Sequence, residues 1–116
     1  RREMSAALSR FPGPDDIDAV YAHNDPSAHG AYTAAKLEGK GREKKIKFIG
    51  IDALPHEGVA YVKEGILTAT FQYPTGGAEA IDTALKILKG EKVEKNITLG
   101  TRIFTKDNAA KGGEAL

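Results

Sequence analysis

Short apolar runs alternate with helical segments along the chain, and this alternation limits the possible folds more than any other feature. The apolar runs are rich in β-branched residues and are predicted to be strands, at residues 17–22, 46–51, 66–71 and 101–106. The segments between them have helical patterns, each followed by a glycine, at residues 26–37, 55–64 and 78–89. Such alternation is typical of a parallel sheet flanked by helices. We therefore predict an α/β, Rossmann-like fold.

A further helix is expected at the start of the chain. Met4, Ala7, Leu8 and Phe11 recur at helical spacing, and a Pro-Gly-Pro sequence ends the pattern. The chain does not begin with Met, and this helix starts at once. We therefore expect the chain to be a piece of a longer protein.

Composition excludes several classes of function. The 116 residues allow one compact domain of ordinary size. Lys and Arg number 17 against 16 Asp and Glu, and this balance argues against strong binding to nucleic acid or anionic membrane. The absence of cysteine excludes disulfides, thiolate catalysis and Cys-ligated zinc.

No motif for a metal, a cofactor or catalysis is found. His23, His29 and His56 lack the spacing of zinc enzymes, and the aspartates of residues 15–18 lack that of a calcium loop. Nucleophile-elbow, P-loop and dinucleotide motifs are also missing. The glycine-rich segment 39–42 is expected to be a solvated loop. We therefore predict a protein that is not an enzyme, with no metal and no cofactor.

Three successive strands are each followed by, or end in, a side chain that can form hydrogen bonds: Asn24, Asp52 and Gln72. In open parallel sheets, ligands bind outside the carboxyl ends of the strands. Two amides and a carboxylate supply the donors and acceptors that sugar hydroxyls need. The alternative is structural: Asn24 and Asp25 would cap the next helix, with Asp25 binding its free amides, while Asp52 and Gln72 would form turns.

Four blocks of the sequence resemble the carboxyl-terminal half of type I periplasmic sugar-binding proteins, such as the ribose-binding proteins. These blocks are residues 20–25 with Gly30 after them, 48–52, 62–72 and 84–91. They occur in the family's order, and the resemblance extends from Asp16 to Asn108. It implies that Asn24, Asp52 and Gln72 contact a bound monosaccharide or similar polyol. Ile51 stands where many relatives have an aromatic residue, so a stacking contact there is not expected.

The resemblance also implies a division of the chain, because the family's proteins have two lobes with the sugar between them. Residues 1–72 would form most of the second lobe, and residues 73–99 a crossover with a helix that packs on the missing first lobe. Residues 100–116 would form a return strand and a frayed tail. The helix in this crossover carries an apolar stripe made of Ala80, Ile81, Ala84, Leu85, Ile87 and Leu88. Because such a stripe needs a partner, we expect the chain to occur with the first lobe or in an associated form.

The implied protein is periplasmic and delivers its sugar to the membrane permease of an ABC-type importer, with no nucleic acid as partner. Two alternatives share the fold. One is the extracytoplasmic sugar-sensing domain of a signalling receptor, and the other is the effector-binding domain of a lactose-repressor-type transcription factor. The residues upstream of Arg1 would distinguish them.

Overall fold

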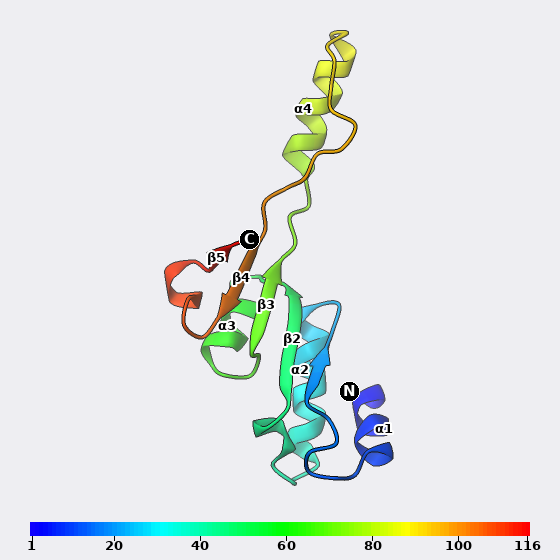
Figure 1. Cartoon of the computed structure of the whole chain (residues 1–116), viewed down its shortest axis with the longest axis vertical. Coiled ribbons are helices and arrows are strands. Elements are labelled where there is room, and N and C mark those ends of the chain that lie inside the picture. The colour runs from blue at the N-terminus through cyan, green and yellow to red at the C-terminus, as the bar shows by residue number, and fades with distance from the viewer.

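The computed structural model describes all 116 residues, which form a five-stranded sheet with the order β1-β2-β3-β4-β5 (Figure 1). The strands are β1 Ala19–Tyr21, β2 Lys47–Asp52, β3 Ala69–Gln72, β4 Arg102–Thr105 and β5 Glu114–Ala115. The helices are α1 Arg2–Arg10, α2 Asp25–Leu37, α3 Gly58–Lys63 and α4 Gly77–Leu88, with short 3-10 turns η1 Arg42–Lys44 and η2 Ala109–Lys111. None of these helices has the length and apolar character required to cross a membrane.

The α/β fold is confirmed, but the sheet is mixed and not wholly parallel. β1, β2 and β3 run parallel, whereas β4 is antiparallel to β3 and β5 is antiparallel to β4. The chain leaves the sheet at the carboxyl end of β3, passes through α4 and re-enters the sheet at the same edge (Figure 1). Because it re-enters where β3 ends, β4 must run in the opposite direction. The tail expected to be frayed contains η2 and the paired strand β5.

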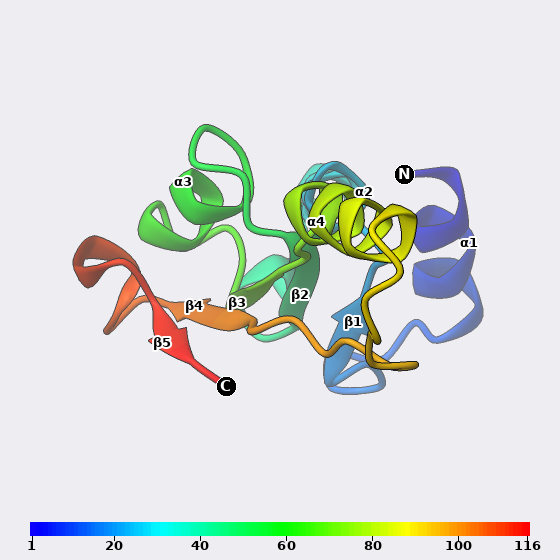
Figure 2. The same cartoon turned by 90° about the horizontal axis from the view of Figure 1, so that it is seen from above.

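The core lies between the sheet and the helices α2 and α3, which cover one of its faces, and α1 packs on α2 beyond the β1 edge (Figure 2). α2 buries four alanines, and their small size lets the helix lie close to its neighbours, among them β2 with the buried Phe48. Met4 and Leu8 of α1 complete this core. The opposite face of the sheet carries apolar side chains that are only half-buried, among them Ile51, Phe71 and Ile103, which are neighbours in register.

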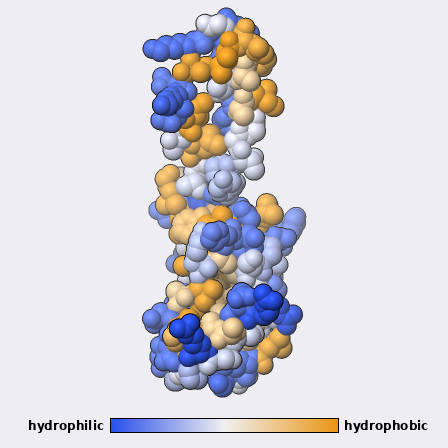
Figure 3. Space-filling model, turned by 90° about the vertical axis from the view of Figure 1, so that its right-hand side faces the viewer, coloured by the Kyte–Doolittle hydropathy of each residue, from blue (hydrophilic) through white to orange (hydrophobic).

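α4 projects away from the rest of the molecule, which makes the chain elongated (Figure 1). The radius of gyration is 18.4 Å, whereas a compact domain of about 100 residues has about 13 Å. The chain therefore does not form a single compact body. No residue of α4 is buried, and hydrophobic residues gather on the projecting part (Figure 3). Ile97 and Leu99 of the return segment lie beside one side of α4, and Ile81, Leu85 and Leu88 lie on another, exposed side.

The prediction that residues 39–42 form a solvated loop is wrong for Arg42, whose side chain is buried and only 2% exposed. Its guanidinium donates hydrogen bonds to the carbonyls of Leu8, Phe11 and Gly13 and to the carboxylate of Glu38. These bonds satisfy carbonyl groups at the end of α1 that the helix itself leaves free. The prediction failed because a local charge pattern does not reveal a partner some thirty residues away.

Candidate functional site

The three residues predicted to bind a ligand all lie at the carboxyl ends of the parallel strands. Asp52 and Gln72 are the last residues of β2 and β3 and are direct partners in the register of the sheet. Partners on neighbouring strands are about 4.8 Å apart, and their side chains leave the same face of the sheet. Asn24 follows β1, which lies on the other side of β2. The fold therefore brings all three residues to one edge, with Asp52 in the middle.

Asn24 has a structural role at this edge. Its Oδ1 accepts a hydrogen bond of 2.8 Å from the backbone N–H of Ser27, so Asn24 is the N-cap of α2. The side chain is half-buried, and this bond fixes its orientation. Only Oδ1 is used, which leaves the Nδ2 group of Asn24 to donate to a ligand. Capping and ligand binding are therefore compatible for this residue.

Asp52 and Ala53 form an unusual turn where β2 ends. Both have positive φ angles, 106° for Asp52 and 53° for Ala53, a region that residues other than glycine rarely adopt. Each such residue costs about 1–3 kcal/mol and persists only where surrounding contacts enforce it. Asp52 itself is half-buried, whereas Gln72 beside it is exposed. The turn sets the direction in which the central carboxylate of the edge points.

Asp25 lies directly beneath this edge and does not cap α2, which corrects the prediction made from the sequence. It is completely buried. Its Oδ2 accepts a hydrogen bond of 2.9 Å from the backbone N–H of Ala53, and its Oδ1 accepts one of 2.6 Å from the hydroxyl of Thr70. The carboxylate therefore joins the start of α2 to the end of β2 and to β3.

Two glycines make room for the Asp25 carboxylate. A Cβ atom added at Gly50 or at Gly58 would collide with its oxygens. Burial raises the pKa of Asp25 above its ordinary value near 3.8, and the hydrogen bonds from Thr70 and Ala53 oppose that rise. The patterns in the sequence did not predict this arrangement. The residues that form it, Asp25, Gly50, Gly58 and Thr70, lie far apart in the sequence, and no local pattern connects them.

The far end of the site is tied to the return strand. The hydroxyl of Thr101 donates a hydrogen bond of 2.5 Å to the backbone carbonyl of Gln72. This bond links the points where the chain leaves and re-enters the sheet, so the base of the projecting part is attached beside the candidate site.

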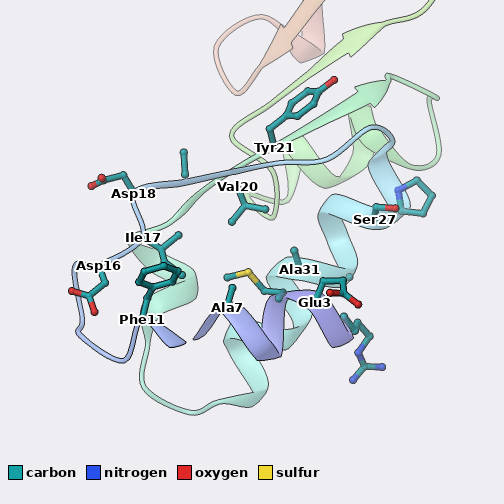
Figure 4. Close-up of a pocket in the computed structure, with 15 residues that line it drawn as sticks. Glu3, Ala7, Phe11, Asp16, Ile17, Asp18, Val20, Tyr21, Ser27 and Ala31 are labelled. Atoms are coloured by element: carbon teal, nitrogen blue, oxygen red, sulfur yellow. The ribbon is translucent and has the colours of Figure 1, made fainter. Parts of the chain in front are cut away.

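A larger hollow lies elsewhere and is distinct from this site. A groove of about 1000 Å³ runs between α1, α2 and β1, the edge strand of the sheet. Its lining is largely apolar, with Phe11, Ile17 and Val20 turned toward α1, whereas Tyr21 points to the other side (Figure 4). None of the three predicted ligand residues lines it. The edge formed by Asn24, Asp52 and Gln72 therefore remains the candidate site.

Comparisons with known proteins define the class to which this fold and edge belong. A family model described as a periplasmic binding protein domain matches residues 1–92. The chain therefore belongs to the periplasmic binding protein family, which consists of substrate-binding proteins and not enzymes. The resemblance noted from the sequence blocks is thereby confirmed.

The relatives with curated names include sugar-binding proteins. The chain is 38% identical over 105 residues to the ribose import binding protein of Escherichia coli (strain K12), covering 89% of this chain and 33% of that protein. It is 30% identical over 116 residues to the fructose import binding protein of Bifidobacterium longum (strain NCC 2705), covering 99% of this chain and 34% of that protein. The chain thus spans about a third of the length of the curated relatives it matches.

Solved structures show the same architecture. The fructose-binding periplasmic domain of a hybrid two-component system superimposes with a TM-score of 0.85 at 43% identity, over 96% of this chain and 36% of that one. The binding protein of the arabinose ABC transporter from Shewanella sp. ANA-3 gives a TM-score of 0.82 at 30% identity, over 96% and 37% of the two chains. These matches establish the fold as that of the periplasmic sugar-binding proteins.

Proposed function

We propose that this chain forms one wall of a sugar-binding cleft, in which Asn24, Asp52 and Gln72 bind a monosaccharide or similar small polyol. The observation that carries the proposal is the gathering of these side chains on one edge of the sheet. The half-buried carboxylate of Asp52 accepts hydrogen bonds from two sugar hydroxyls, and the amides on either side supply donors and acceptors. The names of the relatives, which include ribose, fructose and arabinose, support this class of ligand.

The opposite wall of the cleft is a first lobe outside this chain. The division proposed above places residues 73–99 in a crossover whose helix packs on that lobe. The exposed side of α4, with Ile81, Leu85 and Leu88, supports the proposal because a contiguous apolar surface of this kind marks a site of interaction. The complete protein is a periplasmic carrier that delivers its sugar to the permease of an ABC-type importer.

A second candidate function is sensing. The fructose-binding domain that superimposes on this chain is part of a hybrid two-component system, and its 43% identity exceeds that of the import proteins described above. The same wall of the cleft would then report sugar binding to a signalling receptor. The chemistry of the site is the same in both cases, so the sugar screen below tests both.

The test is calorimetry on the protein that carries this chain together with its first lobe, against D-ribose, D-fructose, L-arabinose and D-allose. We expect one of these sugars to bind. Replacing Asp52→Ala should then cost about 1.5–3 kcal/mol of binding free energy, the range for hydrogen bonds to a charged group.

The matched control is Asp107→Ala. It removes the same charge from an exposed residue that follows β4 at the opposite end of the sheet, so the affinity should not change. If Asp52→Ala binds the sugar as tightly as the unaltered protein, Asp52 is not a ligand residue. If no polyol binds at all, the proposed function is wrong.

A further inference from the structure

We propose that Asp25 is a positioning residue for the candidate site: its buried carboxylate holds the Asp52–Ala53 turn in the geometry that presents Asp52 to the ligand. The part of the proposal that concerns affinity rests on the proposed function. The part that concerns the turn stands on the contacts of Asp25 alone.

The Asp52–Ala53 turn needs an external support. Two consecutive residues with side chains have positive φ angles, 106° and 53°, and neither is the glycine that this backbone region favours. An unsupported turn would relax toward a more common conformation, and the side chain of Asp52 would move with it. The only hydrogen bond to the N–H of Ala53 comes from Oδ2 of Asp25, at 2.9 Å, and it is buried.

The Asp25 carboxylate is itself held on all sides. Its other oxygen accepts from Thr70 at 2.6 Å, and it lies so close to Gly50 and Gly58 that a Cβ atom at either position would collide with it. It cannot turn back to cap α2, where Asn24 already fills that role. A fixed carboxylate that binds the N–H within a strained turn is a direct mechanical link between α2 and the orientation of Asp52.

Five variants, one of them the double variant Asp25→Ala/Gly58→Ala, separate positioning from general stability. Asp25→Ala removes the support and leaves a cavity. Gly58→Ala alone collides with the carboxylate, but in the double variant the added methyl occupies the space that the carboxylate leaves. Thr70→Val removes the other donor to Asp25 and keeps the bond to Ala53. Asp25→Asn keeps both contacts, because its oxygen accepts from Ala53 and its amide donates to the Thr70 hydroxyl.

The first measurement is nuclear magnetic resonance on the folded variants, with the three-bond N–H to Hα couplings of Asp52 and Ala53 and the hydrogen exchange of the Ala53 amide. We expect altered couplings and faster exchange in Asp25→Ala and in the double variant. The double variant should regain much of the stability that each single variant loses. Thr70→Val and Asp25→Asn should keep the couplings of the unaltered protein. Unchanged couplings in the double variant would overturn the proposal.

The second measurement is calorimetry with D-ribose and D-fructose on the two-lobed protein. Affinity should fall about tenfold or more in the double variant, the size of one lost hydrogen bond to a charged group, and change less than about threefold in Thr70→Val and Asp25→Asn. Equal losses in Thr70→Val and the double variant would overturn the proposal, since destabilisation alone would then explain them. If the unaltered protein binds neither sugar, the proposed function fails for these sugars, and the couplings still decide whether Asp25 holds the turn.

Discussion

The exposed side of α4 leads to a prediction whose size follows from the structure. Ile81, Leu85 and Leu88 are 64%, 50% and 83% exposed, which together equals about two fully exposed side chains. Fully burying an aliphatic side chain of this size is worth about 1.5–3 kcal/mol, so covering this side should contribute about 3–6 kcal/mol. That is a large part of a domain's net stability of about 5–15 kcal/mol.

The perturbation is a matched pair of Leu→Ala variants in two proteins. Leu67 is 3% exposed in the core and Leu88 is 83% exposed on α4. In the 116-residue chain, Leu67→Ala should cost about 3 kcal/mol, because it leaves a cavity, whereas Leu88→Ala should cost less than about 0.5 kcal/mol. In the two-lobed protein both variants should cost about 2–5 kcal/mol, because docking also buries Leu88.

The assay is urea unfolding followed by circular dichroism. With a slope of about 2 kcal/mol per molar urea, the loss for Leu67→Ala shifts the midpoint by about 1.5 M, and that for Leu88→Ala in the chain alone by less than about 0.25 M. Sedimentation of the chain shows whether it associates, as an uncovered apolar surface favours. The reasoning is refuted if Leu88→Ala has no effect in the two-lobed protein.

Three further predictions concern stability. Arg42→Met should cost about 3 kcal/mol in urea unfolding, because it removes a buried donor from three carbonyls and from Glu38, which keeps only Lys40 as a partner. Arg102→Met, at an exposed arginine, should cost less than about 1 kcal/mol. Equal losses would contradict this role of Arg42. Burial raises the pKa of Asp25, so its contribution should weaken as pH rises from near its ordinary 3.8 through the raised pKa. The hydrogen bond from Arg42 lowers the pKa of Glu38, so its contribution should be lost as pH falls from its ordinary 4.5 through the lowered pKa. Unfolding midpoints measured across this pH range should lose the dependence attributed to Asp25 in Asp25→Asn and the dependence attributed to Glu38 in Glu38→Gln. If the pH dependence of either variant equals that of the unaltered protein, the residue concerned is not its source.

Local patterns in the sequence predicted most of the elements of the fold. The strand around Phe48 and the helix around Ala31 are each predicted by the spacing of apolar residues within the segment itself. The edge with Asn24, Asp52 and Gln72 could also be predicted, because parallel strands place their carboxyl ends together whatever the details of packing. Their role in binding a sugar stays a prediction.

The direction of β4 could not be read in the same way. The residue pattern of a strand does not show whether the strand pairs parallel or antiparallel. β4, Arg102–Thr105, runs antiparallel because the chain returns from α4 at the edge where β3 ends. The apolar stripe of α4 predicts a covered helix, and the resemblance to two-lobed proteins implies that the cover lies outside this chain. In the structure no residue of α4 is buried, and Leu85 is 50% exposed.

The sequence by itself determined the order and type of the elements and the chemistry at the strand ends, because these depend on neighbours within a few residues. Only the tertiary structure decided the partners of the two buried charged side chains, Asp25 and Arg42. Asp25 meets Ala53 and Thr70, which are 28 and 45 residues away, and Arg42 meets carbonyls 29 to 34 residues away. A buried charge must be satisfied by whatever groups the fold brings to it, and distance along the chain places no limit on that choice.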